Sequence, residues 1–229
     1  MRKLRKGLLL AVFLFLIAVI LYFHLPITEV FQTSREAKII VIDVGHGGFD
    51  PGKVSADDLL EKDINLAIAL RLKPYLEAQD CRVYLTREED CSLCDEASSN
   101  KKQSDMQNRV AFVEQINPDL MISIHQNSFS SPKEHGAQTF YYHTSDNSQL
   151  LAGCIQCSLV EIADPENTRL AKSNDSYYIL KNVSCPAAIV ECGFLSNPTE
   201  SALLNTEIYQ DKIAYAISIG VRTYLNQIE

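Results

Sequence analysis

The stretch Lys38–Gly52, KIIVIDVGHGGFDPG, joins a run of β-branched aliphatic residues to a glycine-rich loop that contains one histidine. The aliphatic residues Ile39–Ile42 predict a strand that is buried on both faces, as in a parallel sheet. The glycines around His46 permit backbone angles that are closed to other residues, and they leave space around the imidazole. Ligands of α/β proteins bind at the carboxyl ends of strands, so this loop predicts a binding site at His46.

The rest of the chain alternates short aliphatic runs with helical patterns. Pro74 is expected to kink or end the first helix early, and Ser104 with Gln107 predicts a capping box. The alternation predicts an α/β fold with a mostly parallel twisted sheet and helices on both faces. We expect strands at 39–44, 82–86, 119–125, 137–142 and 187–190, and helices at 59–76, 104–116, 148–163 and 208–225.

The N-terminus combines a basic flank, residues 1–6, with an apolar run, residues 7–23, that no charge interrupts. The run is long for the core of a signal peptide and slightly short for a spanning helix. No small-residue cleavage site follows it, so we favour an uncleaved membrane anchor over a cleaved signal peptide. Either alternative leaves the basic flank in the cytoplasm and exports the rest. We therefore expect a flank and anchor at 1–26, a linker at 27–37 and a single catalytic domain at 38–229.

Composition narrows the class of protein. A chain of 229 residues with 46% hydrophobic content can bury the core of one domain. Without the four basic residues of the flank, the formal net charge of −8 becomes −12 for the exported part. Because nucleic-acid binding needs a basic surface, this balance argues against a nucleic-acid partner.

Four of the seven cysteines form two C-x-x-C pairs, a pattern that can build a structural zinc site. The pairs are too far apart for a zinc-ribbon loop. Cys154 and Cys157 lie in the helix expected at 148–163, which favours ordinary helix residues. Cys91 and Cys94 lie in a polar loop, where a local disulfide could form in an exported protein. The odd total leaves at least one thiol free or paired between chains.

Three further polar residues are expected at the same edge as His46. His125 ends the strand in DLMISIHQN, Glu191 follows the strand in PAAIVECGF, and Glu61 lies near the start of the helix at 59–76. Two imidazoles, one carboxylate and a water are the open tetrahedral set of a catalytic zinc, and zinc is the metal such ligands favour. Glu191 would then be the carboxylate that takes a proton from the attacking water and returns it to the leaving amine.

Each of these residues has a structural alternative. A lone histidine at a strand end is usually a hydrogen-bonded structural residue, but two at matching strand ends favour ligands. Glu61 alone is weak evidence, because helix dipoles favour acidic residues in a first turn. Three more residues near the edge would contact substrate carboxylates or brace the site. They are Arg87, Arg109 and Asn127. For the two arginines, a structural role in ion pairs is an equally good alternative.

Five segments in order resemble the zinc-dependent N-acetylmuramoyl-L-alanine amidases, from Lys38 onward. They are VIDVGHGGFDPG, the helix with Glu61, VYLTRE, NPDLMISIHQNS and PAAIVECGFLSNPTE. The resemblance implies that His46, Glu61 and His125 bind one zinc ion and that Glu191 is the catalytic acid/base. It also implies the reaction, which is hydrolysis of the amide between the lactyl group of muramic acid and the first L-alanine of the peptidoglycan stem peptide.

Within that family, the chain is most similar to the germination-specific members that act on the spore cortex. The similarity lies in the basic anchor, the polar insert after Thr86 and the absence of cell-wall-binding repeats. It implies a first step toward muramic δ-lactam, at the extracytoplasmic face of the membrane in the intermembrane space of the developing spore. Residues 136–163 leave no room for the autoinhibitory helix of some relatives. Regulation by an accessory activating protein, or through metal binding, is therefore a hypothesis. The sequence gives no indication of oligomeric state.

Two other functions compete with this interpretation. An exported zinc peptidase could use the same ligands to shorten peptidoglycan stem peptides or proteins. A non-catalytic regulator could have the same fold without the activity, although the presence of all four site residues argues against this alternative. The products distinguish the enzymes, because an amidase releases an intact stem peptide and a peptidase shortens it.

Overall fold

The computed structural model describes residue 7, residues 11–20 and residues 36–228. The chain separates into two units, Met1–Glu36 and Ala37–Glu229, and each is described by itself. Residues 11–20 are helical. The described residues include no helix with the length and apolar character that crossing a membrane requires. Most of the expected anchor and linker, at 1–26 and 27–37, lies outside the described residues.

The second unit is built on a six-stranded sheet in the order β2-β1-β3-β6-β4-β5. Neighbouring strands from β2 to β6 are parallel, whereas β4 is antiparallel to β6 and parallel to β5. The predicted mostly parallel sheet is therefore confirmed. The strands are β1 (Ile39–Val44), β2 (Arg82–Leu85), β3 (Leu120–Asn127), β4 (Gln138–Tyr141), β5 (Lys172–Ser173) and β6 (Ala187–Phe194).

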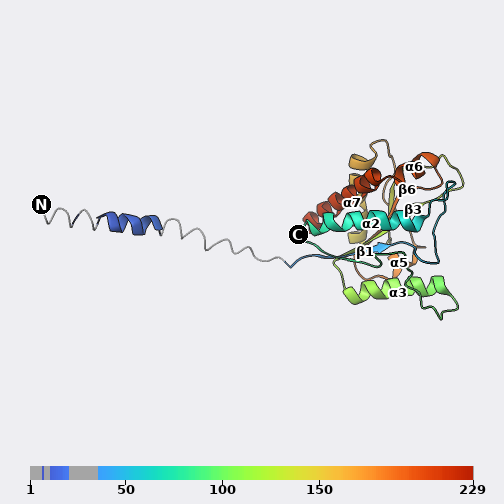
Figure 1. Ribbon diagram of the computed structural model, residues 1–229, viewed down its shortest axis with the longest axis horizontal. Coiled ribbons are helices and arrows are strands. Elements are labelled where there is room, and N and C mark those ends of the chain that lie inside the picture. Colours follow the sequence, from blue (N-terminus) through green and yellow to red (C-terminus); the bar gives the residue numbers. More distant parts are fainter. Residues whose placement is uncertain (1–6, 8–10, 21–35, 229) are drawn as a thin grey trace. The chain divides into compact units, whose positions relative to one another are not determined.

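Helices cover both faces of the sheet, as predicted. Figure 1 shows α2 and α7 on one side of the strands and α3 on the other. The first side is formed by α2 (Glu61–Glu77), α4 (Asp146–Ser158) with its π-helical continuation η2 (Leu159–Ala163), and α7 (Glu207–Ile228). The opposite side is formed by α3 (Lys101–Ile116) and α5 (Tyr178–Asn182), and α6 (Pro198–Leu204) precedes α7.

Alternate residues of β1 enter two separate cores. Ile40 and Ile42 pack with α2 and α7, whereas Val41 packs with α3 and α5. All three side chains are fully buried. Burial of one such side chain contributes about 1.5–3 kcal/mol, so the aliphatic run stabilises both layers at once. This explains why the strand before His46 reads as continuously apolar rather than alternating.

Helix α2 continues through Pro74 to Glu77, so of the two expected effects of Pro74 the early end is wrong, and the kink stays a prediction. A proline within a helix removes one backbone hydrogen bond. Leu72 and Leu76 flank Pro74 and are fully buried in the core, and their packing offsets that loss. The structure confirms that Cys154 and Cys157 are ordinary residues of helix α4. All seven cysteines are free thiols in the structure.

The capping box predicted at Ser104 and Gln107 is also wrong. Helix α3 begins one turn earlier, and its N-cap is Asn100, whose side chain accepts a hydrogen bond from the Gln103 backbone N–H. Asparagine is among the strongest N-cap residues, so it starts the helix before Ser104 is reached. The Ser104 hydroxyl instead accepts a hydrogen bond from the Asp95 N–H at 3.0 Å.

Two strands extend beyond their predicted ends. Strand β3 continues past His125 to Asn127, and β6 continues through Glu191 to Phe194. The register between them shifts between His125 and Asn127, which indicates a bulge of the kind often found beside active sites. His125 and Glu191 therefore project from within paired strands rather than from loops.

Candidate metal centre and its neighbouring carboxylate

His46 follows the end of β1 in a strained backbone conformation. Its φ is +60°, in the left-handed region that residues other than glycine rarely adopt. The ring is held at both nitrogens, because Nδ1 lies 3.0 Å from Asp50 Oδ2 and Nε2 lies 3.1 Å from Glu61 Oε1. A Cβ at Gly52 would lie 2.5 Å from Glu61 Oε2 and 2.7 Å from His46 Cδ2, so only glycine fits there.

Glu61 is the first residue of α2 and is only 4% exposed. Its Oε1 accepts a hydrogen bond from the Gln126 N–H at 3.0 Å, and its Oε2 accepts one from the Lys53 N–H at 2.7 Å. Burial disfavours the charged form, but the hydrogen bonds and charges of His125 and His46 hold the pKa of Glu61 far below its ordinary value. The carboxylate is therefore ionised and suited to a cation.

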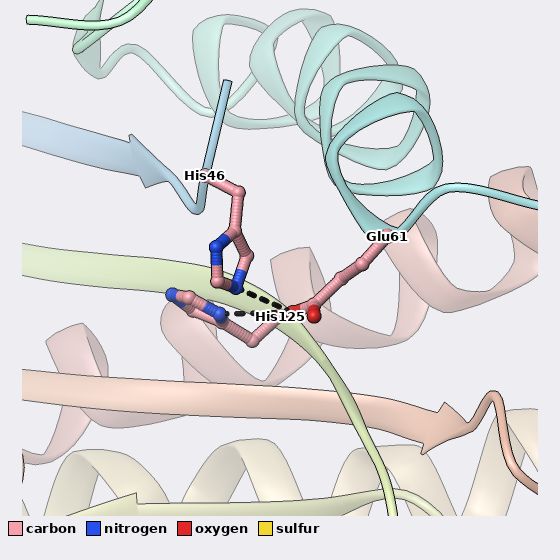
Figure 2. A group of neighbouring side chains, drawn as sticks. All are labelled: His46, Glu61 and His125. Carbon is pink, nitrogen blue, oxygen red and sulfur yellow. Dashed lines mark hydrogen bonds and ion pairs between the residues drawn. The ribbon is translucent and has the colours of Figure 1, made fainter. Parts of the chain in front are cut away.

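His125 completes the group from β3. Its Nδ1 lies 3.1 Å from Glu61 Oε1, and its ring meets the His46 ring edge-on with centroids 4.9 Å apart. The far side of the ring packs on Gly45, where a Cβ would lie 2.4 Å from His125 Cε1 and Nε2. Figure 2 shows the three side chains converging from the loop after β1, the start of α2 and β3.

These three residues fit a zinc ion. Their candidate ligand atoms all lie within 4.8 Å of one another. A tetrahedral zinc with ligands at about 2.0–2.1 Å separates neighbouring ligand atoms by about 3.3 Å. The two distances of 3.1 Å from Glu61 Oε1 to the histidine nitrogens are close to that value. Asp50 supplies the outer carboxylate that typically fixes the tautomer of a ligating histidine.

Glu191 lies beside this group, directly opposite His125 in the pairing of β3 with β6. Its side chain is 6% exposed, and its Oε1 accepts a hydrogen bond from the Tyr177 hydroxyl at 3.1 Å. The buried Oε2 has no hydrogen-bond partner among the residues that the structure describes. Burial raises the pKa of Glu191, and the nearby charge of His125 opposes that rise. A carboxyl group whose pKa is raised holds a proton more readily, as a general acid must.

Arg87 and Arg109 lie beneath the His46 loop rather than on the surface. They are 3% and 1% exposed. Arg87 Nε and Arg109 Nη2 donate to the His46 carbonyl at 2.8 and 2.7 Å, and Arg87 Nη2 donates to the Gly45 carbonyl at 3.1 Å. Arg109 also pairs with Asp43 at 2.8 Å. These contacts favour the bracing alternative over direct contact with a substrate carboxylate.

Asn127 lies at the end of β3, just beyond the bulge, and is half-buried. Its Oδ1 accepts a hydrogen bond from the Ser128 N–H at 2.8 Å, and its carbonyl accepts one from the Leu195 N–H at 2.9 Å. Asn127 is at the same edge of the sheet as the candidate metal ligands. Its contact with a substrate stays a prediction.

Three residues of the site have roles that were not identified from the sequence. Asp50 lies four residues after His46 in the glycine-rich loop, so its proximity to the imidazole could have been suspected. Gly45 is one of several glycines in that loop, and nothing in the sequence distinguishes it. Tyr177 comes from a segment without periodic pattern, and only the fold brings it to Glu191.

Comparisons of the sequence and of the structure with known proteins identify the same family. The family model described as N-acetylmuramoyl-L-alanine amidase matches residues 40–223. The germination-specific N-acetylmuramoyl-L-alanine amidase of Bacillus subtilis is 41% identical over 193 residues, which are 83% of this chain and 81% of that protein.

The solved structures that are similar to this chain include two further amidases. One is the CwlD amidase from Clostridioides difficile in complex with the GerS lipoprotein, with a TM-score of 0.81 and 43% identity over 83% of this chain and 99% of that one. The other is an N-acetylmuramoyl-L-alanine amidase from Clostridium difficile, with a TM-score of 0.76 and 29% identity over 85% of this chain and 100% of that one.

Proposed function

Because this chain belongs to the N-acetylmuramoyl-L-alanine amidase family, we propose that its metal centre hydrolyses the amide between N-acetylmuramic acid and the first L-alanine of a stem peptide. The chain is an amidase, a hydrolase that acts on a carbon–nitrogen bond. We further propose that it acts in the spore cortex, with His46, Glu61 and His125 as zinc ligands and Glu191 as the acid/base.

One observation carries the proposal for the site. A buried carboxyl group, Glu191, lies in register beside His125, which belongs to a His/Glu/His group with the spacing of zinc ligands. The Oε2 atom of Glu191 is buried without a partner in the described part of the chain. An orphaned buried oxygen costs about 1–3 kcal/mol, so its presence beside a metal group suggests a role in the reaction.

A zinc ion in this site would supply a Lewis acid for the scissile carbonyl and make a water more acidic. Side chains of the protein hold the site in place and transfer the proton. Two backbone N–H groups hold the Glu61 carboxylate, so it keeps its position when the substrate arrives. Glu191 accepts the proton of the attacking water and passes it to the nitrogen of the departing alanine. That transfer completes the hydrolysis without a net change in Glu191.

Digestion of purified, peptide-bearing peptidoglycan by the full-length chain tests this reaction. The chain would be compared with and without added zinc, next to Glu191→Ala, and the released fragments read by mass. Intact stem peptides with a free N-terminal alanine, from the zinc-loaded wild type alone, would establish the amidase and the need for Glu191. Shortened peptides would establish the competing peptidase, and intact peptidoglycan from the zinc-loaded chain would indicate a missing partner or a different substrate.

The cortex as the site of action is supported by the similarity to the germination-specific amidase of Bacillus subtilis. A cell-wall substrate requires the catalytic unit to be extracytoplasmic, and we place it in the intermembrane space of the developing spore. Removal of the peptide would be the first step toward muramic δ-lactam. Cortex from a strain that lacks this chain should then contain no δ-lactam, whereas normal δ-lactam content would overturn the assignment.

The basic and apolar segment at 1–26 supports the proposal of a membrane anchor, followed by a linker at 27–37 and the catalytic domain at 38–229. The test is the mass of the protein recovered from a membrane fraction. An intact N-terminus in that fraction would support the anchor, whereas a shortened protein in the soluble extracytoplasmic fraction would establish cleavage.

We also propose an accessory protein as a partner. The structurally similar CwlD amidase was solved in complex with the GerS lipoprotein. A lipoprotein partner for this chain would act on the same side of the membrane as the catalytic unit. A purified chain that is fully zinc-loaded and active alone would count against such a requirement.

A further inference from the structure

Tyr177 occupies a fixed position between two elements of the fold. It directly precedes α5 as its N-cap residue, and its N–H donates to Asn174 Oδ1 at 3.3 Å. Its ring packs edge-on against Phe140 of β4, with ring centroids 5.6 Å apart. The backbone and the ring are thus held independently of the hydroxyl, so the direction of the hydroxyl is set by the fold.

The Tyr177 hydroxyl donates a hydrogen bond to Glu191 Oε1 at 3.1 Å. Burial and the negative charge of Glu191 raise the pKa of Tyr177 well above its ordinary value. The phenol therefore stays protonated at working pH and acts as a donor. Hydrogen bonds to charged groups are among the stronger ones in proteins, particularly where water is excluded.

The two oxygens of Glu191 are consequently in different environments. Tyr177 holds Oε1, whereas Oε2 is buried without a partner among the described residues. Gln138 of β4 is opposite Glu191 in register, but its amide N–H donates to the Leu170 carbonyl and its oxygen accepts from Arg169. Within the described part of the chain, Tyr177 is the side chain that orients this carboxyl group.

We propose that Tyr177 is a positioning residue that holds Glu191 by Oε1 and leaves Oε2 as the oxygen that carries the proton during amide hydrolysis. The inference rests on the proposed function. In the forward step, Oε2 gains the proton of the attacking water as the new carbon–oxygen bond forms. As the carbon–nitrogen bond breaks, Oε2 gives that proton to the departing amine. Tyr177 keeps its own proton throughout.

Tyr177→Phe in the full-length, zinc-loaded chain tests the inference, because it removes the hydroxyl and retains the packing on Phe140. Turnover would be measured on a soluble muramoyl peptide. We expect kcat to fall about tenfold to a hundredfold and KM to change by less than about twofold, because the lost contact is to the acid/base and not to the substrate. Zinc content and the melting temperature should stay close to those of the wild type.

Tyr178→Phe is the matched control, because Tyr178 is the adjacent residue and its side chain is 43% exposed. It should have wild-type kcat and KM. Crystal structures of the zinc-loaded wild type and Tyr177→Phe provide a readout that does not depend on turnover. We expect the Glu191 carboxyl group to rotate or become disordered in the variant.

An unchanged kcat in Tyr177→Phe would overturn the inference, and so would a Glu191 carboxyl group that keeps its position. A rise in KM with unchanged kcat would identify Tyr177 as a substrate contact instead. Failure of the proposed function is a separate result, because it appears as wild-type protein that does not release the peptide with its free N-terminal alanine from the muramoyl peptide. In that case the position of the carboxyl group in the two crystal structures still decides whether Tyr177 orients Glu191.

Discussion

His125 of β3 and Glu191 of β6 are directly opposed across a pair of parallel strands. Paired residues of neighbouring strands point to the same face of the sheet, so the proposed metal ligand and the proposed acid/base meet without any loop between them. A slip of one residue in this register would send one of the two side chains to the opposite face. The reaction therefore depends on strand pairing as much as on the residues themselves.

The first prediction concerns Glu191→Gln, which keeps the size of the side chain and removes its ability to carry a proton. We expect kcat to fall about 10²- to 10⁴-fold, the range attributed to general acid–base catalysis, with zinc content unchanged. Turnover of a muramoyl peptide and metal analysis of the same sample check this. Glu96→Gln, at an exposed position, is the control. Loss of zinc together with activity would show that Glu191 is a ligand instead.

The second prediction concerns Asp50, which accepts the hydrogen bond that orients the His46 ring. Asp50→Asn should weaken zinc binding about tenfold to a hundredfold, because outer partners of ligating histidines contribute that much to affinity. Competition with a chelator of known affinity measures the effect. Asp57→Asn, an exposed position in the same segment, should leave the affinity unchanged. Equal affinities for both variants would contradict the role of Asp50.

The third prediction compares two glycines. An alanine Cβ at Gly45 would lie 2.4 Å from the His125 ring and 2.7 Å from the Ile124 carbonyl oxygen, so Gly45→Ala must displace the ring. We expect loss of bound zinc and a lower melting temperature. Gly153 lies within α4, and a Cβ there meets nothing within 4 Å. Gly153→Ala should raise stability by about 0.5–1 kcal/mol, since alanine is favoured over glycine within a helix.

The outcome for the two glycines is read from the metal content and the thermal unfolding of each variant. If Gly45→Ala retained its zinc, the close packing of the loop against His125 would have no functional role.

The fourth prediction is a pH dependence of stability at Asp43. Its carboxylate is buried and pairs with Arg109 at 2.8 Å, and Ser123 donates to it at 2.6 Å. Burial alone would raise the pKa of Asp43, but Arg109 and Ser123 hold it below the ordinary value of 3.8. The pair therefore contributes stability that is present above about pH 4 and is lost as pH falls through the lowered pKa.

Asp43→Asn should thus lower the free energy of unfolding by about 1–3 kcal/mol at pH 7, because it removes one of the two carboxylates that pair with the buried Arg109 and leaves only Asp105. The difference from the wild type should be smaller at pH 3. Urea unfolding at the two values of pH measures it, with the exposed Asp95→Asn as control. An equal difference at both values of pH would show that the charge of Asp43 is not what stabilises the fold.

Much of this arrangement follows from local patterns in the chain. The aliphatic runs before His46, His125 and Glu191 predicted strands because buried parallel strands are continuously apolar, and the structure brings these side chains and Glu61 to one edge of the sheet. Local signals were less reliable at the ends of elements. Asn100 caps α3 ahead of Ser104, and α2 continues through Pro74, because capping choices and core packing compete with the nearest helix signal.

The sequence by itself determined the α/β class, the parallel strands and the residues that can carry the chemistry, since each depends on residue types close together in the chain. Only the tertiary structure decided that β4 runs antiparallel to β6, that Arg87 and Arg109 lie buried beneath the His46 loop, and that Tyr177 holds Glu191. The physical reason is that each of these features rests on contacts between distant segments. Such contacts are set by the packing of the two cores against the sheet.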